Sequence, residues 1–146
     1  EAYEHLLDRE RLQPVVTMGV DDLGSLGLGW YSVETIGGRD ARWCCGYGIV
    51  FLGAPANAIR GRLTITCAAF RPTTVSVLVD GRHVQEFVLG SSGWQDVDLS
   101  VGIARDFVRI ELLVPSASGW SRDATPSIDD RERGVAVARM TLDVER

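Results

Sequence analysis

Aromatic side chains next to charged ones are the residues of this sequence that could perform recognition chemistry. Trp30 and Tyr31 follow a glycine-rich segment, Arg42 directly precedes Trp43, and Trp120 lies in the polar run Ser-Ala-Ser-Gly-Trp. An indole ring can stack on the apolar C–H face of a pyranose while neighbouring charged groups hydrogen-bond its hydroxyls. This combination of residue types is typical of sugar recognition.

The four tryptophans have different expected environments. Trp43 and Trp94 stand at the beginnings of expected strands, where a large ring more often packs in a sandwich core than forms a ligand platform. Trp120 is surrounded by small polar residues, so among the four it is the one we most expect to be exposed.

An acid and a base near the first two tryptophans suggest an ion pair. If residues 29–35 run beside the strand that starts at Arg42, Glu34 and Arg42 can pair between two indoles. Such a pair could form the floor of a binding site, or it could be buried and fix the register of the sheet edge. The same alternatives apply to Asp130 and Arg131, which could tie a long loop to that edge.

Residues for catalysis or for a bound cofactor are scarce. Neither His5 nor His83 has the spacing of a metal ligand set, and the adjacent Cys44 and Cys45 lack the two-residue gap of a zinc or redox pair. The glycines at 24–29 do not precede an expected helix, so they do not form a phosphate loop. The sequence therefore predicts no enzyme, no catalytic residue and no cofactor.

One acidic cluster has the chemistry of a calcium site. Asp129, Asp130 and Glu132 supply the hard oxygen ligands that calcium needs. Arg131 and Arg133 alternate with them, and neighbouring cations weaken a cation site. We expect ion pairs here and predict no metal, with a structural calcium as the alternative.

Composition excludes several other functions. The 146 residues carry a net charge of -5, which argues against binding to duplex nucleic acid or to an anionic membrane surface. No apolar run reaches the roughly 20 residues needed to span a bilayer. All 15 basic residues are arginine, which we interpret as the codon bias of a GC-rich, bacterial genome. The odd number of cysteines, 3 in all, suits a reducing compartment and favours a cytoplasmic location.

The first 13 residues show the only helical pattern in the chain. Tyr3, Leu6 and Leu7 share one side, and Pro14 ends the pattern. So thin an apolar stripe needs a partner surface, so we expect residues 1–13 to be a helical linker or interdomain joint. The chain starts inside a charged segment without an initiator Met, which suggests a piece of a longer protein with a domain upstream.

Residues 14–146 read as short strands separated by turn residues. Asp80-Gly81 is the strongest hairpin signal, and residues 115–133 form a long polar loop. Alternating apolar residues predict eight strands, at Val15–Val20, Arg42–Leu52, Arg62–Ala69, Val75–Val79, His83–Leu89, Trp94–Val101, Phe107–Val114 and Gly134–Val144. Since crossover helices are missing, the prediction is an all-β, antiparallel β-sandwich of jelly-roll type.

Four segments together resemble a known group of domains. They are Gly-Trp-Tyr-Ser-Val-Glu at 29–34, Ala-Arg-Trp at 41–43, Leu-Val-Asp-Gly at 78–81 and the segment 129–140. In this order and spacing the chain, over residues 20–144, resembles β-sandwich accessory domains of bacterial glycosyltransferases and methyltransferases of cell-surface polysaccharide synthesis. Arg133 departs from that pattern, which has an apolar residue at this position.

The resemblance implies a non-catalytic, carbohydrate-binding-like module that recognises a bacterial surface polysaccharide or its intermediate for an attached biosynthetic enzyme. Its partners would be the glycan and an upstream catalytic domain of the same polypeptide, with a second copy of the chain as a further option. The alternative is a structural, oligomerisation or interdomain docking module without glycan affinity. The candidate ligand-binding residues are Trp30, Tyr31, Glu34, Arg42, Trp120, Asp130 and Arg131.

Overall fold

The structure is a computed structural model that describes residues 12–55, 57–69, 71–90, 93–115 and 134–145. The helix expected over residues 1–13 lies, apart from its last two residues, outside these ranges. The candidate site residues Trp120, Asp130 and Arg131 and the acidic cluster of the possible calcium site also lie outside them.

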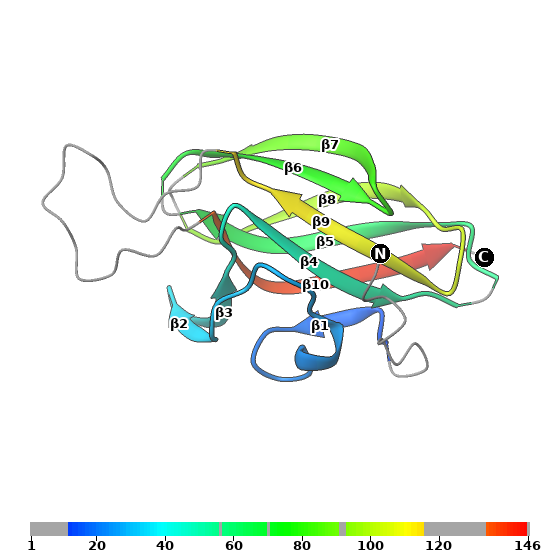
Figure 1. The fold of residues 1–146 in the computed structure, drawn as a ribbon, viewed down its shortest axis with the longest axis horizontal. Helices are drawn as coiled ribbons and strands as arrows, with labels where there is room; N and C mark the ends of the chain where they lie inside the picture. Colours follow the sequence, from blue (N-terminus) through cyan, green and yellow to red (C-terminus); the bar gives the residue numbers. More distant parts are fainter. Residues whose placement is uncertain (1–11, 56, 70, 91–92, 116–133, 146) are drawn as a thin grey trace, which may run out of the picture.

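The first of two antiparallel sheets has β10 at its centre (Figure 1). Its strand order is β2-β3-β10-β5-β8, and β1 pairs with β10 beyond the end of β3. One edge of β10 therefore pairs with β5 along its length, while the other edge is shared between β3 and β1. The six strands are β1 (Val15–Thr17), β2 (Glu34–Ile36), β3 (Arg39–Trp43), β5 (Arg60–Ala69), β8 (Gln95–Gly102) and β10 (Val135–Glu145).

The second sheet has the order β4-β9-β6-β7 and packs on the first. Buried and partly exposed residues alternate strictly along β6, as a strand with one face on a core requires. Its hairpin with β7 turns at Asp80-Gly81, as the sequence predicts. The four strands are β4 (Tyr47–Gly53), β6 (Thr73–Val79), β7 (Arg82–Leu89) and β9 (Phe107–Leu113).

The core lies between the two sheets and is made of aliphatic side chains from both. Leu63 and Ile65 of β5 face Val75 and Val77 of β6, and all four are fully buried in one cluster. Each such side chain stabilises the fold by about 1.5–3 kcal/mol through burial. A smaller cluster lies on the outer side of β4 and β9 and consists of Leu12, Ile49, Phe51 and Phe107.

The all-β antiparallel jelly-roll sandwich is confirmed, with three differences in its elements, of which the first is β2, a strand absent from the expected set. The strand expected over 42–52 is two strands in different sheets, because the chain leaves the first sheet after Trp43 and enters the second at Tyr47. The strand expected to reach Val20 ends at Thr17, whose N–H donates to the Asp21 carboxylate at 2.8 Å. Gly19 follows with φ +82°, which breaks the extended backbone.

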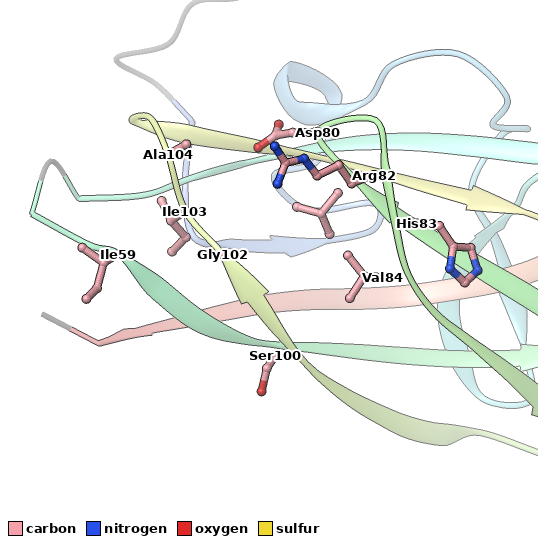
Figure 2. Close-up of a pocket in the computed structure, with 10 residues that line it drawn as sticks. Ile59, Asp80, Arg82, His83, Val84, Ser100, Gly102, Ile103 and Ala104 are labelled. Atoms are coloured by element: carbon pink, nitrogen blue, oxygen red, sulfur yellow. The ribbon is translucent and has the colours of Figure 1, made fainter.

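The two sheets meet at an open edge between β7 and β8. A cavity of about 640 Å³ opens there, between the β6–β7 turn and the loop that follows β8 (Figure 2). Within the ranges given above, no helix has the length and apolar character needed to cross a membrane.

Candidate functional site

The β2–β3 hairpin positions the charged residues that the sequence singles out. Gly37 and Gly38, at φ +55° and +82°, form the two-residue turn that a tight hairpin requires. Glu34 pairs with Ala41, and Thr35 with Asp40. Since directly paired residues share a face, one face of the hairpin carries Glu34, Ile36, Arg39 and Ala41, and the opposite face carries Thr35, Asp40 and Arg42.

Trp94, just before β8, contacts the tip of this hairpin. Its indole Nε1–H donates to the Ile36 carbonyl oxygen at 3.0 Å. The Arg39 guanidinium lies 5.9 Å from the ring centroid, within cation–π range. A Cβ at Gly37 would come within 3.0 Å of the same Nε1, so the close approach requires glycine. The indole is half-buried, so part of it is exposed beside Arg39.

We call this group of residues the Trp94 platform: Trp94, Arg39 and the hairpin face that also carries Glu34. It combines an oriented ring with a cation and an acid, which is the chemistry that can stack on a sugar and hydrogen-bond its hydroxyls. Among the described residues of the sequence-predicted set, Glu34 lies on the hairpin face that carries Arg39.

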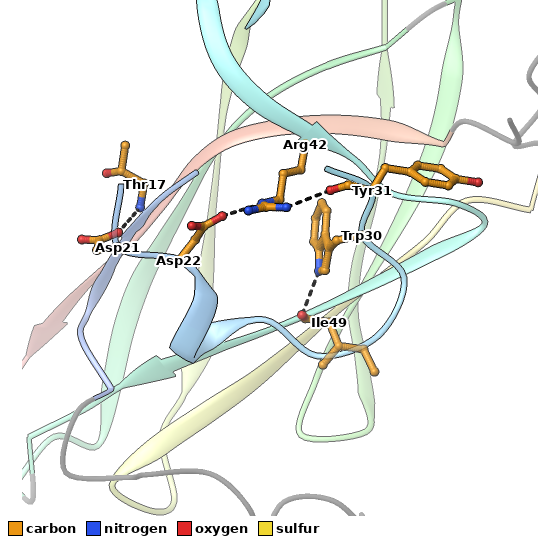
Figure 3. A network of polar contacts seen from close by, with 7 residues as sticks. All are labelled: Thr17, Asp21, Asp22, Trp30, Tyr31, Arg42 and Ile49. Atoms are coloured by element: carbon orange, nitrogen blue, oxygen red, sulfur yellow. Dashed lines mark hydrogen bonds and ion pairs between the residues drawn. The ribbon is translucent and has the colours of Figure 1, made fainter. Parts of the chain in front are cut away.

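Arg42 points away from the platform, into a buried ion pair (Figure 3). Its Nε–H donates to the Asp22 carboxylate at 2.6 Å, and its NH1 donates to the Tyr31 carbonyl oxygen at 3.0 Å. The Asp22 side chain is only 3% exposed and the Arg42 side chain 13%. The pair ties the segment after β1 to β3.

The expected ion pair between Glu34 and Arg42 is wrong, because the two residues lie on opposite faces of the hairpin. Asp22, an acid that the sequence analysis did not consider, takes that position. The buried alternative for Arg42, in which an ion pair fixes the sheet edge, is the arrangement found.

Trp30 and Tyr31 lie beside the end of β3, in the segment between β1 and β2, and Trp30 forms an isolated β-bridge with Cys44. The Trp30 Nε1–H donates to the Ile49 carbonyl oxygen at 2.9 Å (Figure 3). A Cβ at Gly48 would come within 2.7 Å of the Trp30 ring, which packs against the core. The Tyr31 N–H donates to the Trp43 carbonyl oxygen at 2.9 Å, and the ring extends away from Arg42.

The predicted environments of two tryptophans can be compared directly. Trp43 is 6% exposed, which confirms its place in the core. Trp94 was expected there too, but it is half-buried against the hairpin. Sequence reasoning also missed Arg39, although the Gly37-Gly38 pair before it is a hairpin signal that could have placed Arg39 at the start of the return strand.

Metal-binding and nucleophilic groups do not gather in the described part of the chain. No group of three or more His, Cys, Asp or Glu residues there could hold a metal ion. Burial, together with the smaller effect of the nearby Asp96 carboxylate, raises the pKa of the Cys67 thiol from 9.0 to about 12. That thiol is protonated at neutral pH, so it is not a poised nucleophile.

Comparison with known proteins gives a fold likeness only. No protein-family model matches the chain, and no curated protein sequence matches it. The family 35 carbohydrate-binding module from Clostridium thermocellum is similar in structure, with a TM-score of 0.61 and 11% identity over 88% of this chain and 97% of that one. The module CsCBM6-3 from Clostridium stercorarium, solved with cellobiose, gives 0.53 and 14%, over 90% and 93% of the two chains.

A third similar structure is part of a larger enzyme. A cycloisomaltooligosaccharide glucanotransferase from a Paenibacillus species, complexed with cycloisomaltoheptaose, gives a TM-score of 0.57 and 12% identity. The match covers 92% of this chain but only 19% of the enzyme. The fold of the chain is therefore the β-sandwich of carbohydrate-binding modules, which occurs both as separate modules and within longer chains.

Proposed function

We propose that this chain is a non-catalytic carbohydrate-binding module. The observation that carries the proposal is the Trp94 platform. Its indole is oriented by the Ile36 carbonyl oxygen, and Arg39 lies at the ring. The ring supplies the stacking surface, and Arg39 with Glu34 supplies hydrogen-bonding groups for sugar hydroxyls. The fold likeness to carbohydrate-binding modules supports the same conclusion.

The sequence-predicted residues take different roles in this proposal. Glu34 belongs to the platform, whereas Trp30 and Arg42 act as positioning residues. The Trp30 Nε1–H is bound by the Ile49 carbonyl oxygen. The Arg42 guanidinium is bound by the Asp22 carboxylate and the Tyr31 carbonyl oxygen. Tyr31, Trp120, Asp130 and Arg131 remain predicted ligand contacts.

The glycan we propose is a bacterial surface polysaccharide or its biosynthetic intermediate, bound in the cytoplasm for a catalytic domain on the same polypeptide. The module would then act by effective concentration, keeping the growing chain near the active site without chemistry of its own. The resemblance over residues 20–144 supports this finer assignment.

A glycan array of bacterial polysaccharides, followed by calorimetric titration of each hit, tests the proposal. Trp94→Ala is expected to weaken binding about five- to thirtyfold, because removal of a stacked ring costs about 1–2 kcal/mol. Trp94→Phe keeps a stacking ring and should retain most of the affinity. Tyr47→Ala, which removes a 40% exposed ring on the other sheet, is the matched control and should bind normally.

Two results would decide against the proposal. The first is that no glycan on the array binds. The second is that Trp94→Ala keeps the wild-type affinity for the glycan and the wild-type thermal transition. Titrations with calcium and with a chelator form a separate arm, and calcium-dependent binding would support the alternative of a metal at residues 129–132.

Exposed apolar side chains favour a second candidate, a docking or oligomerisation module. Val20, Leu23 and Leu28 are 77%, 78% and 58% exposed, and all lie between β1 and β2. A partner surface could cover such side chains. Sedimentation of the 146-residue chain over a hundredfold concentration range would show self-association, and Leu23→Ser should abolish it. A monomer at all concentrations excludes the homo-oligomer.

A further inference from the structure

The cavity between β7 and β8 is at the opposite end of the sandwich from the Trp94 platform. Trp94 precedes β8, whereas Ser100 and Gly102 line the cavity at the other end of that strand. Seven residues of extended chain separate Gln95 from Gly102, or about 23 Å at 3.3 Å per residue. The cavity is therefore separate from the proposed sugar site, and the inference below does not depend on the proposed function.

Both walls of the cavity are held in place by hydrogen bonds. The Asp80 carboxylate accepts from the Arg109 N–H at 3.0 Å and from the Arg105 guanidinium at 2.8 Å, which fixes the β6–β7 turn to β9. On the facing wall, the Ile103 N–H donates to the Ile59 carbonyl oxygen at 3.0 Å. The cavity is thus formed before any ligand arrives, as small-molecule sites usually are.

A β-bulge in β7 determines which side chains of that strand line the cavity. Val77 pairs with Gln85 but the next residue, Leu78, pairs with His83, so Val84 is one extra residue in β7. A bulge re-aims the side chains next to it. Val84 lies between β7 and β8 in the cavity (Figure 2).

Arg82 has an unusual position for a charged residue. It pairs with Val79, so its side chain starts from the core-facing side of the sheet. Among the described residues, its guanidinium makes no hydrogen bond or ion pair. The nearby Asp80 carboxylate is already neutralised by Arg105 at 2.8 Å. Arg82 therefore brings to the lining of the cavity a cation that has no ion-pair partner among the described residues.

The rest of the lining is aliphatic. Ile59, Val79, Val84 and Ile103 form the apolar surface, and Ile59 is 65% exposed. The volume of about 640 Å³ lies within the usual range for small-molecule sites. A cavity that combines this apolar lining with the cation of Arg82 suits a ligand that has an apolar body and one anionic group.

We propose that this cavity is a second binding site, for a small organic anion whose carboxylate or phosphate meets Arg82 and whose carbon body lies on Val84 and Ile103. A guanidinium forms paired hydrogen bonds with either anion. The overall charge of -5 repels anions, so binding depends on this local arrangement and on the apolar contact together.

Four simple probes separate these contributions. Cyclohexyl phosphate and cyclohexanecarboxylate carry both features and differ in the anion. Cyclohexylmethanol lacks the charge, and inorganic phosphate lacks the apolar body. Titration of the ¹⁵N-labelled 146-residue chain should give saturable shifts at Arg82, Val84 and Ile103 with one or both ring-bearing anions, and at least tenfold weaker binding of the other two probes.

Arg82→Gln tests the role of the charge. The affinity of this variant for the ring-bearing anion should fall at least tenfold. The affinity of Arg82→Lys should fall less, because lysine keeps the positive charge. Arg71→Gln makes the same change in net charge at an exposed position near the start of β6, and it should bind as the wild type does. Because Arg82 is exposed, all three variants are expected to keep the wild-type thermal transition.

Other outcomes overturn the proposal. Equal binding of cyclohexylmethanol would show that Arg82 does not select an anion, and equal binding of inorganic phosphate would show that the apolar surface contributes nothing. Shifts outside the cavity, or no binding of either ring-bearing anion, would assign Arg82 to protection of the open sheet edge against pairing.

Discussion

The environment of a charge decides what its ion pair contributes. Asp22 and Arg42 are 3% and 13% exposed, so loss of the carboxylate leaves a guanidinium in a poorly solvated place. Asp22→Ala is expected to lower the free energy of unfolding by about 3 kcal/mol, measured by urea denaturation. Asp22→Asn keeps an oxygen acceptor and should recover part of the loss.

A matched pair on the surface provides the control for that variant. Arg62 and Asp98 are 3.9 Å apart, with side chains 68% and 47% exposed. Asp98→Ala should therefore change the free energy of unfolding by less than about 1 kcal/mol. Equal losses in Asp22→Ala and Asp98→Ala would contradict the assignment of the buried pair as the link between the segment after β1 and β3.

Gly48 leaves the space in which the Trp30 ring packs. An added Cβ would lie 2.7 Å from that ring and 3.0 Å from the Cys44 side chain, and both neighbours are held in place. Gly48→Ala should destabilise the protein by about 1–3 kcal/mol through overpacking, observed as a lower urea midpoint. A Cβ at Gly24 meets no atom within 4 Å, so Gly24→Ala should cause almost no change.

The Cys67 thiol makes the free energy of unfolding depend on pH in the alkaline range. Its pKa is raised from 9.0 to about 12, mainly by burial, so the folded state holds the proton more tightly than the unfolded state. This contribution is fully present below pH 9 and is lost as the pH rises toward 12. The free energy of unfolding should fall by about 1.4 kcal/mol per pH unit in that window.

The variant Cys67→Ala isolates this effect from other titrations. The unfolding free energies of the wild type and Cys67→Ala, measured by urea at pH 8 and at pH 10.5, should converge at the higher pH. A constant difference between the two proteins would show that the thiol does not couple protonation to folding.

Single residues show how far sequence reasoning about the candidate site extends. Glu34 was predicted in the site, and its face could be assigned only once the Gly37-Gly38 turn had set the register with Ala41. Trp94 was assigned to the core because a strand start gives no information about what covers it. The hairpin that holds it is 58 residues away in sequence.

At the scale of elements, the β6–β7 turn should be the most sensitive connection. Asp80 has φ +51°, and its carboxylate accepts from both Arg109 and Arg105. Asp80→Ala loses these bonds and places alanine in a left-handed conformation, so it should cost about 2–3 kcal/mol of unfolding free energy. Asp80→Asn tolerates that conformation and keeps the bond to the Arg109 N–H, so it should cost less in the same urea assay.

Alternation in the sequence predicts strands well where one face is buried and the other is not. Val75, Val77 and Val79 are buried at every second position of β6, as expected. The run 42–52 gave a wrong single strand because β4 is buried on both faces and so lost its period-two pattern. The change of sheet at residues 44–46 depends on pairing with distant partners, which a local pattern does not contain.

At the scale of the whole molecule, β10 is expected to make folding a single cooperative transition. It pairs with β1, β3 and β5, and Val135, Val137 and Met140 are fully buried. Contacts between distant parts of a chain slow folding, so stopped-flow refolding is expected in milliseconds to seconds. Deletion of residues 135–146 should abolish the cooperative urea transition, and a surviving transition would show that the two sheets fold separately.

The antiparallel pairing of β1 with β10 has a consequence for how the domain could be used in a longer polypeptide. Val15 lies opposite Thr141, so the sandwich is entered and left at one pole, while the hairpin with Trp94 is at the other (Figure 1). Neighbouring sequence joined at either side would therefore be attached at the pole opposite the hairpin. The Trp94 platform would then face away from the neighbouring sequence, and the Arg82 cavity would face toward it.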